Sequence, residues 1–198
     1  MLAVEDIFEK YVEDPTTLQD FLSAHAYKLK NPDAKIYKVF ILYSEGPNLA
    51  KSRLLTMLAS MYPEDKRLII PRWETFKRGF MNADDLCKSF IVFDNPDVRE
   101  KFRIKNVATQ RDFSLDGFVA INIGPELEPF FRQLPIDIRV FIRFKPQPIS
   151  QKDLRRLEKA KNLAEYFKYE YINLSCPDLE RWDTGLDAHM KERYHITD

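Results

Sequence analysis

Four side chains along the middle of this chain have chemistry that suits a bound polyphosphate. Lys51 and Ser52 follow a turn that contains glycine, proline and asparagine, and the apolar stretch 39–43 precedes that turn. Asp94 and Asn122 each stand at the end of a later apolar stretch. A lysine neutralises phosphate oxygens, a hydroxyl and a carboxylate supply oxygen ligands for Mg²⁺, and a polar residue beside them can orient an attacking water. The pattern therefore predicts a site for a phosphate-bearing ligand and magnesium.

The residues around Lys51 follow the strand, turn, helix order of a phosphate-binding loop, in which backbone N–H groups at a helix N-terminus surround the phosphates. The expected nucleotide-binding residues are Gly46, Pro47, Asn48, Ala50, Lys51 and Ser52. Two glycines of the consensus are absent, because Glu45 occupies the first position and Ala50 directly precedes Lys51. A glutamate at the first position adds a steric cost and a negative charge near the phosphates. In an alternative register Gly46 is the first glycine and the loop is one residue shorter, and both registers predict weakened nucleotide affinity.

Short apolar stretches alternate with segments of helical pattern through the middle of the chain. The expected strands are 36–43, Arg67–Pro71, Ser89–Phe93, Phe118–Ile121 and Ile138–Phe144. This alternation indicates an α/β fold with a mostly parallel sheet and helices on both faces. Ligands bind beyond the carboxyl ends of the strands in such a sheet, so Lys51, Asp94 and Asn122 are expected to converge there. The alternative interpretation is that asparagine and aspartate end these strands only because they suit turns.

Helical patterns flank the alternating region on both sides. Residues 4–30 predict two helical pieces separated by Pro15, the second with a capping box that begins at Thr17. Ser150 is expected to cap a basic helix that continues to about Tyr169. We therefore divide the chain into an N-terminal helical segment at 1–33, a central α/β domain at 34–149, and a C-terminal helical segment and tail at 150–198.

The charge balance and the content of cysteine and histidine argue against several classes of protein. The chain holds 31 basic and 31 acidic residues, so it lacks the excess positive charge of a non-specific polyanion binder. Cys87, Cys176 and the three histidines have no spacing that suits a zinc site or a disulfide framework. The sequence contains neither an apolar stretch of about eighteen residues nor a recognisable secretion signal. We expect an intracellular protein that is neither membrane-spanning nor secreted.

These motifs, in this order, resemble the helicase domain of the superfamily-three helicases, which are the P-loop motors of replication initiator proteins in small DNA viruses and plasmids. The family's Walker A loop commonly reads G-P-P-N-T-G-K-S, and residues 45–52 align with it. The matched positions are Pro47, Asn48, Lys51 and Ser52. The family's Walker B strand is similar to Phe90–Asn95, and its motif C, an apolar strand ending in asparagine, is similar to Phe118–Asn122. The resemblance covers residues 36–146 and implies a P-loop NTPase-like central domain with ATP and Mg²⁺ as cofactors.

The resemblance also implies roles for the polar residues. Those expected to act in catalysis are Asp94, Asn95, Asn122 and Arg139, with Ser52 and Asp94 as magnesium ligands. Arg139, or in second place Arg132, would be the arginine that one subunit of a homo-oligomeric ring inserts into its neighbour's site. Asn95 stands where the family has a second carboxylate, and because an amide is a poor base, slow hydrolysis or none is expected. Asp97 is a candidate substitute for that carboxylate.

Within residues 99–111, basic side chains alternate with uncharged ones from Lys101 to Asn106, which predicts an extended strand with one basic face. Superfamily-three helicases have a hairpin in this region that grips single-stranded DNA through basic residues. The nucleic-acid candidates are Lys101, Arg103, Lys105 and Arg111. They would contact phosphates rather than bases, on DNA or RNA. The alternative is a solvated amphipathic strand.

Three functions remain open from the sequence. The first is an ATP-dependent replicative helicase domain of a DNA virus or plasmid replication protein, weakly active or inactive, in the nucleus or cytoplasm of a host cell. The second is a non-enzymatic scaffold, on the same degenerate fold, that binds nucleic acid or a replication complex. The third is a small-molecule kinase, against which the sequence shows no glycine-rich lid and no evident acceptor-binding carboxylate.

Overall fold

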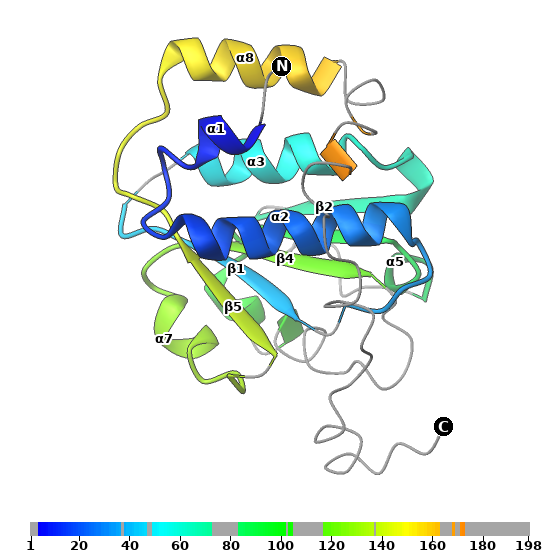
Figure 1. The fold of residues 1–198 in the computed structure, drawn as a ribbon. Helices are drawn as coiled ribbons and strands as arrows, with labels where there is room; N and C mark the ends of the chain where they lie inside the picture. The colour runs from blue at the N-terminus through cyan, green and yellow to red at the C-terminus, as the bar shows by residue number, and fades with distance from the viewer. Residues whose placement is uncertain are drawn as a thin grey trace.

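The computed structural model describes residues 4–36, 38–46, 49–72, 83–101, 103–104, 117–136, 138–162, 168 and 171–172 of the 198-residue chain. Five strands form one sheet in which every neighbouring pair is parallel, in the order β2-β3-β4-β1-β5 (Figure 1). The strands are β1 (Val39–Tyr43), β2 (Arg67–Pro71), β3 (Phe90–Asp94), β4 (Phe118–Ile123) and β5 (Arg139–Arg143). The expected α/β fold with a parallel sheet is therefore confirmed.

The central strands are short runs of β-branched, aromatic and other apolar residues that are covered on both faces. Every residue of β1 and β4 is buried, as is typical of parallel strands between two layers. β4 lies between β1 and β3, and its Asn122 is in register with Leu42 on one side and Asp94 on the other. Because all the strands run in the same direction, the residues that follow them gather at one edge of the sheet.

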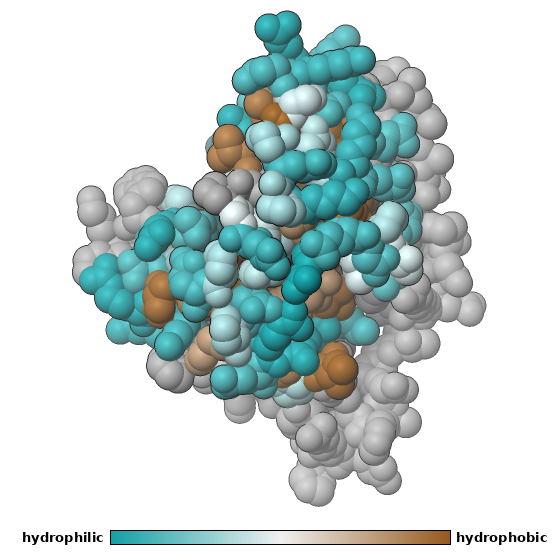
Figure 2. Space-filling view, turned by 90° about the vertical axis from the view of Figure 1, so that its left-hand side faces the viewer, coloured by the Kyte–Doolittle hydropathy of each residue, from teal (hydrophilic) through white to brown (hydrophobic). Residues whose placement is uncertain are grey.

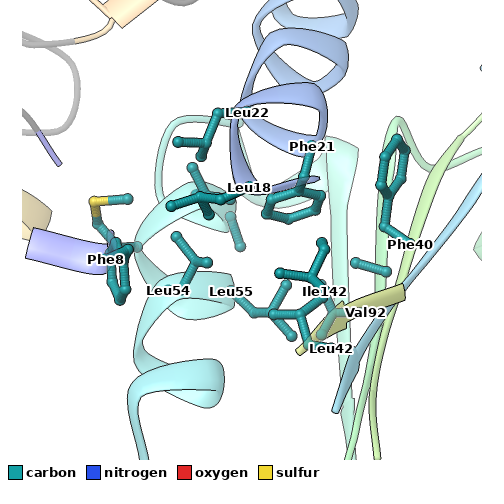
Figure 3. Close-up of a cluster of buried hydrophobic side chains, with 14 of the residues drawn as sticks. Phe8, Leu18, Phe21, Leu22, Phe40, Leu42, Leu54, Leu55, Val92 and Ile142 are labelled. Atoms are coloured by element: carbon teal, nitrogen blue, oxygen red, sulfur yellow. The ribbon is translucent and has the colours of Figure 1, made fainter. Parts of the chain in front are cut away.

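Four helices lie on the same side of the sheet, the last of them in an outer layer against the others (Figure 1). They are α1 (Val4–Phe8), α2 (Pro15–Lys30), α3 (Leu49–Ala59) and α8 (Gln151–Asn162). Figure 3 shows Phe21 and Leu22 of α2 and Leu54 of α3 in one buried cluster with side chains of the strands. The Phe21 ring lies 5.2 Å from the Phe40 ring and 5.6 Å from the Phe118 ring. Burial of each such side chain contributes about 1.5–3 kcal/mol, so this layer fixes α3, which carries Lys51, against the sheet.

The opposite face is covered by shorter elements. They include α7 (Glu128–Phe131) and the 3-10 helix η2 (Val98–Glu100). The described residues also form the short helices η1 (Glu64–Lys66) and α5 (Ala83–Leu86). Phe131, Leu134 and Ile104 form a second apolar cluster with the side chains of β1, β3 and β4 that point to this face. The sheet is thus enclosed between two apolar layers.

The N-terminal cap of α2 differs from the expected one. Asp14 is the N-cap, and its Oδ1 accepts a hydrogen bond from the Thr16 N–H at 2.9 Å. Pro15 occupies the first helical turn, where its missing N–H and fixed φ suit a helix start. The capping box predicted at Thr17 is therefore wrong, because the helix begins two residues earlier.

The helical segments at the two ends of the chain share the apolar core of the central region. Phe8 and Leu157 belong to the same cluster as Phe40. The Tyr11 hydroxyl donates a hydrogen bond of 2.8 Å to Asp153 Oδ2, which joins the segment after α1 to the start of α8. The Asp153 N–H donates to Ser150 Oγ at 3.1 Å, so the predicted Ser150 cap is confirmed.

Candidate functional site

Ser52, Asp94 and Asn122 meet at the carboxyl edge of the sheet. Ser52 Oγ donates a hydrogen bond of 2.8 Å to Asp94 Oδ1. Asn122 Nδ2 donates to the same Asp94 oxygen at 2.5 Å and to Ser52 Oγ at 3.1 Å. The three residues come from α3, β3 and β4, so the sheet order decides their convergence. One hydroxyl, one carboxylate and one amide thus form a connected polar group.

Lys51 lies beside this group and is almost completely buried. It is 4% exposed, and its Nζ donates a hydrogen bond of 2.7 Å to the Ile123 carbonyl at the end of β4. Burial lowers the pKa of Lys51 to about 8, while the negative charges of Asp94 and Glu126 act in the opposite direction. A buried ammonium that donates its hydrogen bond to a neutral carbonyl would be stabilised strongly by an anion, because the local dielectric constant is low.

The loop that precedes Lys51 accommodates its departures from the consensus. A side chain at Gly46 would meet no atom within 4 Å, and the φ of Gly46 is not in the left-handed region, so nothing requires glycine at this position. Ala50 is fully buried and belongs to the apolar cluster beneath α3, whereas Glu45 is exposed. The predicted loop residues Pro47 and Asn48 lie outside the described residues. The exposed position of Glu45 and the buried position of Ala50 therefore suit their side chains.

The donor set around Ser52 and Asp94 fits a magnesium ion bound together with phosphate. Mg²⁺ prefers oxygen ligands, keeps several waters and usually takes one or two protein oxygens plus phosphate oxygens. Asn122 Oδ1 is buried and has no hydrogen-bond partner among the described residues, so a further oxygen acceptor is present in this group. Within the described part of the chain, no cluster of three or more His, Cys, Asp or Glu could hold a metal by itself. The site thus suits a cation that arrives with its own phosphate ligands.

Asn95 and Asp97, the two candidates near Asp94 for activating water, lie in a turn and in an ion pair with Arg99, respectively. Asn95 is exposed with φ 52°, the left-handed region in which asparagine is enriched, and its N–H donates to the Asn122 carbonyl at 2.9 Å. Asp97 accepts two hydrogen bonds of 2.9 Å from the Arg99 guanidinium, and these hold the pKa of its carboxyl well below the usual range. Asn95 thus acts as a turn residue, and Asp97 is an anion committed to Arg99.

Glu126 is a carboxylate near Lys51 that the sequence did not single out. It lies three residues beyond the end of β4, and its charge acts on Lys51 together with that of Asp94. The pattern of polar residues at strand ends identifies Asn122 but not a residue in the turn after it. The sequence signal available was the turn-forming pair Gly124-Pro125 directly before a glutamate.

Arg139 lies far along the sheet from the loop of its own subunit. It is in register with Val39, the first residue of β1, and therefore stands at the amino edge of the sheet. Its guanidinium lies 5.8 Å from the Phe141 ring centre, and its Nη1 is buried without a hydrogen-bond partner among the described residues. Arg132 lies 5.1 Å from the same ring and forms an ion pair with Glu128. Arg139 and the loop at Lys51 therefore lie at opposite edges of the sheet of one chain.

The predicted extended strand at 99–111 is wrong for its described part. Val98–Glu100 forms η2, and Lys101, Arg103 and Ile104 have helical backbone. Ile104 is fully buried against the sheet, so its packing, rather than the local alternation of charge, decides the conformation. Lys101 lies 5.3 Å from the Phe130 ring centre and Arg103 is exposed. The candidates Lys105 and Arg111 lie outside the described residues.

The side of the molecule that carries α7 and β5 is mostly hydrophilic over its described residues (Figure 2). Apolar side chains appear there only as separate small patches. Lone exposed apolar residues are ordinary on protein surfaces, so this view gives no sign of an apolar docking site.

Comparison of the chain with protein-family models and with curated proteins finds no match. Among the described residues, no helix is both long and apolar enough to cross a membrane. The fold and the site geometry are therefore the basis for any functional proposal.

Proposed function

We propose that this chain is a P-loop domain that binds ATP with magnesium and, like the superfamily-three helicases it resembles, acts on single-stranded nucleic acid as a homo-oligomer. The observation that carries the proposal is the buried Lys51 beside the Ser52, Asp94 and Asn122 group, at the carboxyl edge of a parallel sheet. This edge is where open α/β sheets bind their ligands.

The arrangement suits phosphates for three physical reasons. Lys51 lies in the first turn of α3, where the N-terminal backbone N–H groups and the positive end of the helix dipole favour an anion. The buried ammonium would gain an anionic partner when a phosphate binds. Ser52 and Asp94 would hold Mg²⁺, which neutralises charge on the phosphate oxygens, and Asn122 would keep both side chains oriented through its two hydrogen bonds.

A non-enzymatic scaffold is the second candidate, and one observation favours it. The Asn95 side chain is an amide, which is a poor base, and the Asp97 carboxylate accepts two hydrogen bonds from Arg99, so neither supplies an available base beside Asp94. On this alternative the loop is inherited architecture, and binding of single-stranded nucleic acid would not depend on nucleotide.

Calorimetric titration of the full chain with ATP and magnesium tests the proposal. We expect saturable binding that the Lys51→Ala variant abolishes and that the Lys159→Ala variant, which removes an exposed lysine of α8, retains. A parallel titration with a single-stranded oligonucleotide, with and without ATP, separates the two candidates. Absence of saturable ATP binding by the unmodified chain would refute the nucleotide site, and nucleotide-independent oligonucleotide binding would then favour the scaffold.

A further inference from the structure

The turn that follows β4 carries a carboxylate folded back onto its own backbone. The chain turns through Gly124–Leu127, with the Leu127 N–H bonded to the Gly124 carbonyl at 3.2 Å. The two Glu126 carboxylate oxygens lie 2.6 Å and 3.3 Å from the point where a Cβ would stand on Gly124. A methyl group at this position would displace the carboxylate. The absence of a side chain at Gly124 thus permits Glu126 to lie over the end of β4.

The same strand end holds Lys51. Lys51 Nζ is 2.7 Å from the carbonyl oxygen of Ile123, the residue directly before Gly124. Standard covalent geometry across that peptide, together with the contact at Gly124, places the Lys51 nitrogen and a Glu126 oxygen no more than about 10 Å apart. An arrangement of lysine, phosphate oxygen, phosphorus, water and carboxylate has a length of the same order, so this limit on the Lys51–Glu126 distance permits a phosphate and a water between the two side chains. Glu126 is also exposed, so water reaches it freely.

Two other carboxylates of this edge already accept hydrogen bonds. Asp94 accepts hydrogen bonds from Ser52 and Asn122, and Asp97 accepts two from Arg99. An ionised carboxylate can act as a general base only if it reaches the water whose proton it removes. Of Asp94, Asp97 and Glu126, Glu126 is the exposed one, and its charge acts on Lys51.

We propose that Glu126 is the catalytic base of this domain, which orients the attacking water and removes its proton during nucleotide hydrolysis. The water oxygen forms a bond to the γ-phosphorus while the bond from that phosphorus to the β,γ-bridging oxygen breaks. The bridging oxygen keeps the electron pair and leaves as ADP, the water proton passes to Glu126, and the other product is inorganic phosphate. The inference rests on the proposed ATP site and assigns to Glu126 the role that Asn95 does not fill.

Two variants test the role on the full chain, each compared by ATP turnover and by calorimetric ATP–magnesium binding. Glu126→Gln keeps the shape of the side chain and removes the base, so turnover should fall about 100-fold while the dissociation constant stays within about threefold. Gly124→Ala keeps the carboxylate and displaces it, so turnover should fall about tenfold with binding retained. Glu64→Gln, at a side chain 93% exposed on η1, is the matched control and should match the unmodified chain.

Each other outcome overturns the assignment. Turnover in Glu126→Gln within about threefold of the unmodified chain would exclude a base at this position. Tighter ATP binding in Glu126→Gln without loss of turnover would identify Glu126 as an electrostatic barrier to phosphates. Saturable ATP binding without measurable turnover in the unmodified chain would refute the base and leave the proposed nucleotide site intact, whereas absence of binding would refute both.

Discussion

Replacing Lys51 with methionine should stabilise the ligand-free protein at neutral pH while removing the residue on which ATP binding is proposed to depend. Burial lowers the pKa of Lys51 from 10.5 to about 8. One pKa unit corresponds to about 1.4 kcal/mol, so the charged lysine costs the folded state about 3 kcal/mol at pH 7. Methionine has a similar shape without the charge, but the Ile123 carbonyl then loses its lysine donor, at a cost of about 1 kcal/mol. The expected gain in the free energy of unfolding is about 2 kcal/mol.

The gain should depend on pH in a defined direction. Below about pH 8, Lys51 is protonated in both the folded and the unfolded chain, so the full cost of the buried charge is present. Between pH 8 and 10.5 the unfolded chain holds this proton and the folded chain releases it, so the stability of the unmodified protein rises with pH relative to the variant. The advantage of Lys51→Met should therefore shrink through this range and reach zero or below at its upper end.

Urea unfolding of both proteins at pH 7 and pH 10.5, followed by circular dichroism, measures the difference. Groups other than Lys51 titrate alike in the two proteins and cancel in the comparison. Lys159→Met, at an exposed position of α8, controls for the general effect of removing a lysine. A Lys51→Met variant that is less stable at pH 7, or a stability difference that does not change with pH, would refute the argument that burial of the charge strains the folded state.

Three further predictions concern the core and the helix cap. Burial lowers the pKa of His25 to about 3, so between pH 3 and pH 6.5 the imidazole is neutral in the folded protein and charged in the unfolded chain. The protein should therefore lose about 2 kcal/mol of stability between neutral pH and pH 5. Urea unfolding of His25→Gln over the same pH range should show a smaller loss. Phe21→Ala should reduce the free energy of unfolding by about 3–5 kcal/mol, because the ring is fully buried against Phe40 and Phe118; a loss below 1 kcal/mol in urea unfolding would contradict this packing. Asp14→Ala should cost about 1 kcal/mol by removing the α2 cap, whereas Asp14→Asn, which keeps an acceptor, should cost much less in the same assay.

The sequence by itself determined the strands and hence the fold class. The strand predicted at Arg67–Pro71 matches β2, and the other four lie within a few residues of their observed bounds. Strands buried on both faces must consist almost wholly of apolar residues between turn residues, so each is visible without knowledge of its neighbours. The same reasoning selected Ser52, Asp94 and Asn122, because residues that follow parallel strands share one edge of the sheet.

The tertiary structure decided the features that depend on contacts between segments distant in sequence. The position of β4 between β1 and β3 brings Asn122 next to Asp94, and no local pattern encodes that order. Burial of Ile104 against the sheet overrides the alternating charges around it and gives a helical turn. The lowered pKa of Lys51 likewise arises only where α3 meets the end of β4. Residue type and spacing thus determine which side chains could act at the site. Burial and strand order determine the distances between these side chains and their protonation, because desolvation and hydrogen bonding depend on residues that only the folded chain brings together.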